Sequence, residues 1–395
     1  MKAIRNALDR AKPLFEEGGR CKRLYPLYEA TEGFFFSSPA TTTGSVHLRD
    51  AWDLKRMMFM VVVALIPCTL MGIYNAGYQV LLARGEATPF VGCVLLGALK
   101  VVPIILVSYI VGGAWEVLFA CVRKHEINEG FLVTGLLFPL TLPPSMPLWE
   151  VAVSISFGVV IGKEVFGGTG MNVLNPALTA RAFAFFAYPS AMSGDRVWTA
   201  VNHAKDRLVD GFSGATPLSV AAAGAKGPHA IDAIQAAGYN YWQAFTGFTP
   251  GSIGETSTVA CLIGAAILIA TGVGSWRTMA ACVLGMAGTS ALFNALAGSS
   301  SVPMLSLPPQ WHLVLGGFAF GTVFMATDPV SCAATTVGKW IYGVLIGALC
   351  ATIRAVNPAY PEGMMLAILF MNVFAPLIDY YVLQGHMKRR LAHAQ

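Results

Sequence analysis

Two long stretches of the chain contain no charged side chain, and this feature restricts the possible folds most strongly. Residues 57–83 and residues 278–327 hold no Asp, Glu, Lys or Arg. A helix needs about 20 apolar residues to cross the hydrocarbon core of a bilayer, so each stretch is long enough. Charged residues make up 12% of the chain, about half of the ~25% typical of soluble domains. The sequence therefore indicates a polytopic helical membrane protein, and it excludes a soluble enzyme, a disordered chain and a collagen.

Ten apolar segments are the expected membrane spans: residues 57–80, 99–122, 130–146, 148–166, 172–189, 256–275, 278–297, 311–327, 338–356 and 363–384. Lys and Arg mark the cytoplasmic ends of spans, and here they alternate consistently if the N-terminal tail is cytoplasmic. An even number of spans then returns the C-terminus to the cytoplasm. We expect a cytoplasmic tail (1–56), a first membrane unit (57–189), a periplasmic loop (190–255), and a second membrane unit with a short cytoplasmic C-terminus (256–395).

The two membrane units share a local pattern. Gly168-Thr169 is followed after five residues by Asn175-Pro176, and Gly321-Thr322 is followed after five residues by Asp328-Pro329. Five spans in each unit place the units in opposite orientations, and interrupted helices at corresponding positions are typical of inverted repeats. The predicted fold is an all-α polytopic membrane protein of about ten transmembrane helices, arranged as two inverted five-helix repeats.

The cysteines and the net charge exclude further classes of site. No two of the eight cysteines are closer than 18 residues, so the CxxC spacing of zinc and many iron–sulfur ligands is absent. The net charge of +5 is mild, and its basic clusters lie beside apolar spans, where they orient the protein in a membrane. We therefore expect no zinc or iron–sulfur ligands and no nucleic-acid partner.

The segment Asp210-Gly-Phe-Ser-Gly-Ala-Thr216-Pro217 lies in the loop, outside every apolar span. Asp, Gly and Ser favour tight turns, and Pro217 fits the first turn of the helix-like stretch that follows, so composition alone favours a turn. The segment also resembles the acceptor motif of the periplasmic flavin transferase, whose core is Asp-Gly-x-Ser-Gly-Ala-Thr. In proteins that carry this motif, FMN is joined through its phosphate to the threonine hydroxyl.

Further segments resemble a single family over essentially the whole chain. They are His47-x-Arg49-Asp50, Asp53-Leu-Lys55-Arg56, Arg123–Gly130, Lys163–Gly170, Asn175-Pro-Ala177, Phe324–Ser331 and Asn357–Gly363. With the acceptor motif, they make the chain similar to the B subunits of Na+-translocating NADH:quinone reductases. The D subunits of electron-transport complexes share the membrane core and the acceptor motif, but the long N-terminal tail favours the B subunits.

The resemblance implies a translocase component in the bacterial inner membrane, with other subunits, a flavin transferase and lipid as its partners. It implies that electrons from NADH pass through covalent FMN and noncovalent riboflavin to ubiquinone, and that this transfer is coupled to Na+ export. The residues it points to are Thr216 for FMN attachment; Asp210, Gly211, Ser213, Gly214 and Ala215 for transferase recognition; Asn172 and Asn175 for riboflavin; and Gly112 and Gly113 for quinone.

Three acids in or beside the spans are candidates for the Na+ path: Glu116, Asp328 and, more weakly, Asp379. Carboxylates within the bilayer are costly and usually functional. Each candidate also has an ordinary alternative. Glu116 could be an interfacial acid paired with Arg123 or Lys124, and Asp328 could cap a helix. Similarly, Asn172 and Asn175 could satisfy the backbone at a proline break, and adjacent glycines usually permit close helix packing. Arg181, in the fifth span, either pairs with one of these three acids or neutralises flavin phosphate or reduced flavin.

Two other functions stay open at this point. One is that of a component similar to the D subunits, within a ferredoxin:NAD electron-transport complex. The other is that of a passive solute channel or carrier built from the same inverted repeats, in which residues 190–255 would form only a vestibule. A flavin bound covalently to Thr216 distinguishes the redox proteins from the channel.

Overall fold

The computed structural model describes residues 2–15, 22, 25–36, 54–124, 127, 129–201, 206, 208–209, 212–224, 230–298, 302–357 and 360–394. All regular secondary structure in these ranges is helical, which confirms the predicted all-α class. Within them, five helices are long and apolar enough to cross a membrane. They are α3 (Leu54–Arg84), α4 (Phe90–Arg123), α13 (Trp276–Ala297), α16 (Thr336–Val356) and α17 (Met364–Ala394). The arrangement as ten spans in two inverted repeats stays a prediction.

The remaining helices are shorter. Those of the first membrane unit and the tail are α1 (Lys2–Phe15), α2 (Tyr25–Phe35), α5 (Gly130–Leu140), α6 (Leu148–Val160), η2 (Glu164–Phe166) and α7 (Pro176–Ala187). Those of the loop are α8 (Pro189–Met192), α9 (Pro217–Ala223), α10 (Ala230–Ala236) and α11 (Tyr241–Thr246). Those of the second unit are α12 (Thr258–Ala270), η3 (Pro303–Ser306), α14 (Pro309–Val314), α15 (Phe318–Phe320) and η4 (Gly321–Met325).

One expected span differs from the structure. Residues 311–327 do not form one continuous helix but lie in three short helical pieces, α14, α15 and the π-helical turn η4. The interruption falls at Gly316, whose φ of +65° is unfavourable for a residue with a side chain. The short helix α5 ends at Leu140, before the end of the span expected at 130–146.

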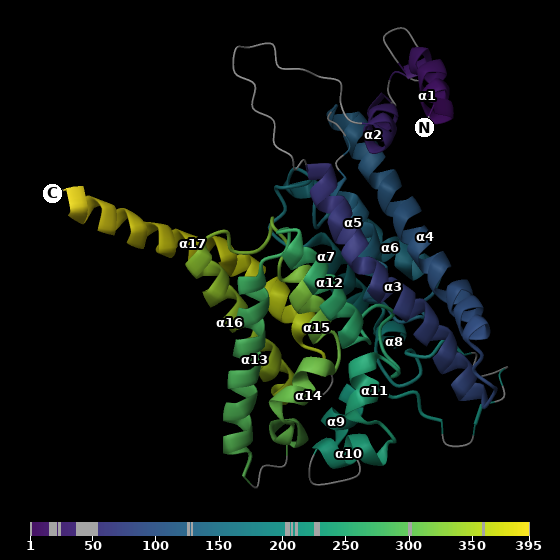
Figure 1. Cartoon of the computed structure of the whole chain (residues 1–395), viewed down its shortest axis with the longest axis vertical. Coiled ribbons are helices and arrows are strands. Elements are labelled where there is room, and N and C mark those ends of the chain that lie inside the picture. Colours follow the sequence, from purple (N-terminus) through teal and green to yellow (C-terminus); the bar gives the residue numbers. More distant parts are fainter. Residues whose placement is uncertain are drawn as a thin grey trace.

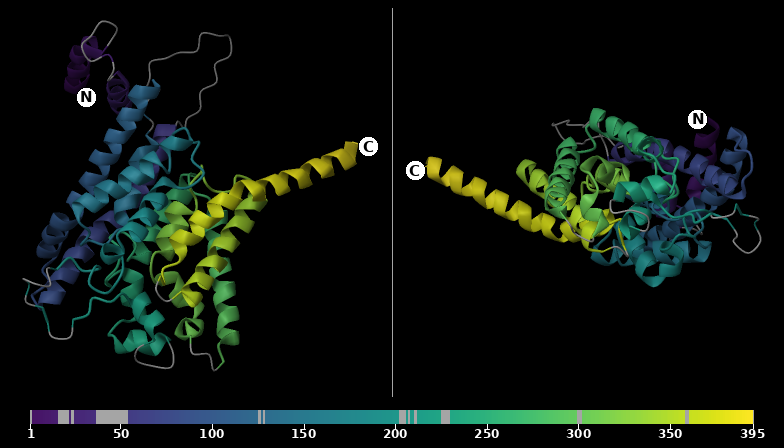
Figure 2. Two further views of the ribbon diagram at one scale, coloured as in Figure 1. Left: turned by 180° about the vertical axis from the view of Figure 1, so that it is seen from behind. Right: turned by 90° about the horizontal axis from the view of Figure 1, so that it is seen from below.

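Two pairs of long helices form the sides of the molecule (Figure 1). α3 packs against α4, and α13 packs against α16. Between them lies a continuous apolar core to which α5, α6, α7, α12, α15, η4 and α17 contribute. Both views in Figure 2 show that α17 leaves this core and extends well beyond it towards the C-terminus.

The loop helices build a cap at one end of the molecule. α9, α10 and α11 pack with η3 and α14 around a second, smaller apolar core that contains Leu218, Ile234, Ala244, Met304 and Trp311. In Figure 1 this cap lies at the lower end, and α1 and α2 lie at the upper end. The segment expected as a separate loop therefore packs together with part of the second membrane unit.

Glycines let the paired helices touch backbone to backbone. A Cβ at Gly97 of α4 would collide with the carbonyl oxygen of Ile73 in α3, and one at Gly77 of α3 would collide with the carbonyl oxygen of Cys93. At the other pair, Gly285 of α13 approaches the backbone of α16 in the same way. Small residues at helix crossings are how membrane helices gain close packing.

We predict that Gly97→Ala destabilises the protein by separating α3 from α4, at a cost of about 1–3 kcal/mol typical of overpacking. The apparent melting temperature of the detergent-purified protein should fall. Gly288→Ala in α13 is the matched control, because a Cβ there meets nothing within 4 Å. Equal melting temperatures for the two variants would show that the α3–α4 contact is not tight.

Candidate functional site

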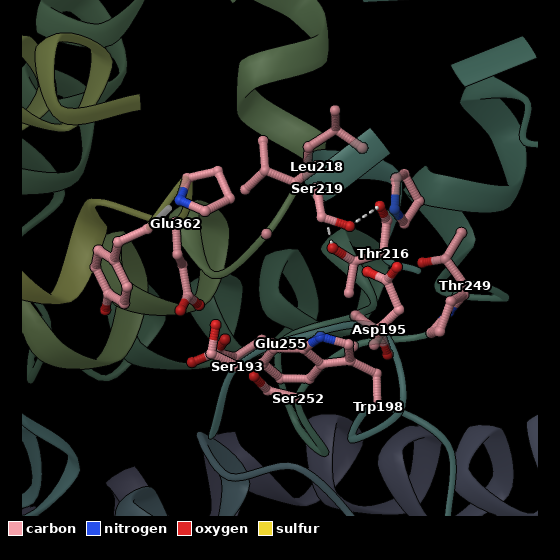
Figure 3. Close-up of a pocket in the computed structure, with 18 of the residues that line it drawn as sticks. Ser193, Asp195, Trp198, Thr216, Leu218, Ser219, Thr249, Ser252, Glu255 and Glu362 are labelled. Atoms are coloured by element: carbon pink, nitrogen blue, oxygen red, sulfur yellow. Dashed lines mark hydrogen bonds between the residues drawn. The ribbon is translucent and has the colours of Figure 1, made fainter. Parts of the chain in front are cut away.

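A cavity of about 520 Å³ lies between the cap and the ends of the membrane helices. Its volume falls within the ~300–1,000 Å³ of typical small-molecule sites. In Figure 3, Thr216 and Ser219 line one side of this cavity and Glu362 lies on the opposite side. The cavity walls also include Trp198, Asp195, Glu255 and other residues of the loop and of both membrane units, among them Arg181, Phe185, Thr249, Ser252, Leu315 and Tyr360.

Thr216 is held at the cavity wall as the N-cap of α9. Its Oγ1 accepts a hydrogen bond from the Ser219 backbone N–H at 3.1 Å, and the Ser219 hydroxyl donates to the Thr216 carbonyl at 2.8 Å. Pro217 occupies the first helical position, where its missing N–H costs nothing. The predicted turn followed by a helix start is therefore present, and Thr216 remains half-buried with its hydroxyl beside the cavity.

The residues before Thr216 form a tight loop. Gly214 has a φ of +68°, and a Cβ there would lie 2.6 Å from the Asp195 carbonyl oxygen, so only glycine fits. The Ser213 hydroxyl accepts from the Ala215 N–H at 3.3 Å. Asp210 and Gly211, expected as part of the transferase motif, lie outside the described residues.

Tyr239 fastens this loop to the rest of the cap. Its hydroxyl donates a hydrogen bond to the Ala215 carbonyl at 2.9 Å. Burial, with a smaller contribution from the Asp195 charge, raises the pKa of Tyr239 to about 12. The phenol therefore stays protonated at neutral pH and keeps its role as a donor.

Arg181 lies at the inner end of the cavity with only 2% of its surface exposed. Its guanidinium forms an ion pair with Glu362, and it donates to the Tyr360 hydroxyl at 2.8 Å and to the Thr141 carbonyl at 3.2 Å. The sequence suggested Glu116, Asp328 or Asp379 as the acid partner of Arg181. In the structure the partner is a different acid, Glu362, which belongs to the other membrane unit.

Glu255 is a second buried carboxyl at the same place, with 4% of its surface exposed. It faces Glu362 over Gly317: a Cβ at residue 317 would lie 2.7 Å from Glu255 Oε2 and 2.8 Å from Glu362 Oε1. Glu255 Oε1 has no hydrogen-bond partner among the described residues. Two carboxyl groups and one guanidinium thus lie together in a largely buried place beside the cavity.

The two Gly-Thr-x5-Asn/Asp-Pro motifs meet inside the molecule. Asn175 Nδ2 donates to Asp328 Oδ2 at 3.3 Å, although the two residues are 153 positions apart. Asn175 also caps α7, since its Oδ1 accepts from the N–H groups of Ala177 and Leu178. Asp328 accepts from the Ser331 hydroxyl at 2.7 Å. Asn175 therefore performs the capping that was its ordinary alternative, whereas Asp328 precedes a turn, not a helix, and accepts from the Val330 N–H at 3.3 Å within that turn.

A cavity of about 80 Å³ adjoins this contact, and Asn172, Asn175, Asp328 and Lys163 line it. Asn172 donates to the Leu174 carbonyl at 2.9 Å. The volume is well below the ~300 Å³ at which small-molecule sites begin, so a flavin ring does not fit the cavity in this form. The riboflavin role of Asn172 and Asn175 stays a prediction.

Glu116 pairs with a cation other than the two that the sequence suggested. Glu116 Oε1 lies 2.5 Å from Lys163 Nζ, and both side chains are buried. Arg123 instead pairs with Glu164 at 3.1 Å. Glu116 therefore belongs to a buried cluster of charges at the end of α4, rather than to the exposed interface.

Gly112 serves close packing in this structure. A Cβ at Gly112 would lie 2.5 Å from the Phe131 ring, whereas one at Gly113 would lie 3.7 Å from the same ring.

Asp379 of α17 is bound at the start of α16. It accepts from the Ala334 N–H at 2.6 Å, the Thr335 N–H at 3.1 Å and the Thr335 hydroxyl at 2.5 Å. The quinone and Na+ roles of these residues stay predictions.

Glu255, Glu362, Trp198 and Tyr239 are the residues that the sequence did not single out. A buried arginine in an apolar span requires an acid partner. For Arg181, this requirement limits the candidate partners to the few acids at the ends of spans. Glu362 even lies within one of the segments that carry the family resemblance. Trp198 and Tyr239 carried no comparable signal, because aromatic residues are common throughout this chain.

Comparisons with known proteins agree with the resemblance. The model of the NQR2, RnfD, RnfE family matches residues 41–388. The B subunit of the Na(+)-translocating NADH-quinone reductase from Pseudomonas paraeruginosa is 52% identical, covering 98% of this chain and 99% of that protein. The B subunits of the same reductase from Azotobacter vinelandii and Yersinia pestis are 52% and 50% identical over nearly their full lengths.

We predict that Arg181→Ala destabilises the protein by about 3–5 kcal/mol, because it leaves the Glu362 carboxylate buried without a counter-charge. The apparent melting temperature reports this loss. Arg84→Ala is the matched control: Arg84 pairs with Asp206 at 3.1 Å where both side chains are partly exposed, and such pairs contribute about 0–1 kcal/mol. If the two variants melt alike, Arg181 has access to water or a second counter-ion.

Proposed function

The chain belongs to the NQR2, RnfD, RnfE family, and from this premise we propose that it is the membrane subunit of a redox-driven Na+ pump. It receives electrons that other subunits take from NADH, passes them to ubiquinone, and couples this transfer to Na+ export. Its relatives that are about 50% identical are named as B subunits of Na(+)-translocating NADH-quinone reductase. The observation that carries the proposal is the position of Thr216 in the wall of a flavin-sized cavity.

The residues present fit a covalent FMN on Thr216. The Thr216 hydroxyl is half-buried beside the cavity, on a loop of small residues that a flavin transferase can grip. The cavity combines an aromatic wall, Trp198, with polar groups at its inner end, which is the pattern of cofactor sites. FMN bound there would supply reversible electron transfer.

The chain's own residues set the conditions for that chemistry. Tyr239 holds the loop that presents Thr216, through its hydrogen bond to the Ala215 carbonyl. Arg181 and Glu362 place an ion pair at the inner end of the cavity. The guanidinium favours the reduced, more negative form of a nearby redox group, and the Glu362 carboxylate offsets part of this effect.

The proposed Na+ path uses Glu116, Asp328 and Asp379. Asp328 adjoins the π-helical turn η4 and the contact between the two Asn/Asp-Pro breaks, and broken helices at such positions provide ion sites in inverted-repeat transporters. Glu116 is supported by its burial within a charge cluster. We also propose Gly112 and Gly113 for the quinone and Asn172 and Asn175 for riboflavin, as the resemblance implies.

The proposed setting is the bacterial inner membrane with both termini in the cytoplasm and the cap in the periplasm, where a flavin transferase has access to Thr216. The arrangement of α1 and α2 at the end opposite the cap supports this orientation (Figure 1). A redox protein and a passive channel differ in one respect that is simple to measure, the presence of covalent flavin.

We predict that Thr216→Ala abolishes flavin fluorescence on a denaturing gel of protein produced together with the flavin transferase. The wild type should fluoresce, because the phosphoester survives denaturation. Thr249→Ala is the control, since Thr249 lines the same cavity but lies outside the acceptor motif. A wild-type band without fluorescence would exclude the flavin-carrying redox protein and favour the channel.

We predict that Glu116→Gln weakens the Na+ dependence of quinone reduction by the assembled complex and leaves the flavin content intact. The substitution removes the carboxylate and leaves the Lys163 charge without its nearest partner. Glu164→Gln, which alters the neighbouring acid of the same cluster, tests whether any loss of charge there has this effect. Normal Na+ activation of Glu116→Gln would make Glu116 a structural member of the cluster only.

A further inference from the structure

Glu255 and Glu362 are two carboxyl groups that face each other at the inner end of the cavity that Thr216 lines. Both approach the place that a Cβ of residue 317 would occupy, and Gly317 leaves them room because it lacks a side chain. The pair lies within hydrogen-bonding reach, and Ser252 also contacts Glu255. Two ionised carboxylates so close together repel each other, and a hydrogen bond between them requires that one carries a proton.

The surrounding charges decide which of the two is ionised. Arg181 forms its ion pair with Glu362, and Arg354 donates to the Glu362 carbonyl at 3.2 Å. Burial alone would raise the pKa of Glu362, but the Arg181 charge, the hydrogen bonds from Glu255 and Arg181, and the Arg354 charge together lower it. Burial, and then the Glu362 charge, raise the pKa of Glu255 well above its usual value. Both residues lie in connections outside the membrane-spanning helices, and the directions of the two pKa values favour Glu255 as the residue that carries the proton.

The other titratable and charged groups around the pair come from several elements. They are Arg181 of α7, Cys261 of α12, Arg354 of α16, Tyr360 before α17, and Asp195 on the wall of the same cavity. The two arginines balance two carboxylates in charge. The site can therefore lose the shared proton without leaving a net negative charge in a buried place.

The environment of Glu255 Oε1 indicates that a ligand in the cavity interacts with this carboxyl group. It is buried and has no hydrogen-bond partner among the described residues, while the residue as a whole lines the cavity. A buried polar atom without a partner is rare in folded proteins and calls for an explanation. A ligand in the cavity that exchanges hydrogen bonds or protons with Glu255 provides one.

We propose that Glu255 and Glu362 share one proton and transfer it to the isoalloxazine ring of the cavity's flavin when that ring is reduced. This inference rests on the proposed attachment of FMN to Thr216. Reduction adds two electrons, which come from NADH through the partner subunits, and one proton at the flavin N5. The pair supplies that proton and becomes two carboxylates. On reoxidation the electrons leave for quinone, the N5–H bond breaks, and the proton returns to the pair.

The test is infrared difference spectroscopy of the assembled complex, oxidised against reduced. Protonated carboxyl groups have a C=O stretching band of their own, and we expect this band to decrease on reduction and return on reoxidation. In the wild type, ¹³C-labelled glutamate should shift the band, which assigns it to Glu without any substitution. Glu255→Gln should abolish the change. Its amide N–H replaces the donor towards Glu362, so the flavin content should stay normal.

Glu150→Gln is the matched control. Glu150, in the first turn of α6, is also buried, and its Oε2 has no hydrogen-bond partner among the described residues, but it does not line the cavity. The redox-dependent band should persist in this variant. Its loss in Glu150→Gln, or its persistence in Glu255→Gln, would overturn the proposal, as would a band that does not respond to glutamate labelling.

Flavin fluorescence on the gel separates this inference from the function on which it rests. If Thr216 carries no flavin, the proposed function fails and the proton pair loses its acceptor. If Thr216 carries flavin and the carboxyl band does not change on reduction, only the proton pair is wrong. Thr216→Ala should remove the flavin and the band change together.

Discussion

A guanidinium without access to water requires a counter-charge from within the protein, and for Arg181 that counter-charge is Glu362, 181 residues away. The pair joins α7 of the first membrane unit to the connection before α17 of the second. Tyr360 and the Thr141 carbonyl complete the hydrogen bonds of the guanidinium. This one buried contact forms the inner end of the large cavity, where Glu255 also lies.

The sequence predicted the features that follow from periodicity, composition and local motifs. The all-α class, the long spans α3, α4, α13, α16 and α17, and the helix start after Thr216 all belong to this group. Such features depend on residues near each other along the chain. The similarity of the two motifs was visible in the sequence, but the contact between Asn175 and Asp328 was not predicted.

What the sequence could not predict depends on pairings between distant segments. The alternative to a Na+ role paired Glu116 with Arg123 or Lys124, but Glu116 lies against Lys163, because η2 folds back towards the end of α4. The span expected at 311–327 is interrupted by the backbone conformation of Gly316, a property that apolar composition does not reveal. Glu255 and Glu362 became a pair only once the loop before α12 and the loop before α17 lay together over Gly317.

The glycine contacts between α3 and α4, and between α13 and α16, have a mechanical consequence. Helices whose backbones touch have little freedom to slide or separate, because any shift brings carbonyl oxygens and Cα atoms into collision. Each of these two helix pairs therefore moves as one rigid unit. Any motion that alternates the access of an ion must pass between these rigid units, through the short broken helices and the polar contacts that join them. Among these contacts are those of Asn175 with Asp328 and of Arg181 with Glu362.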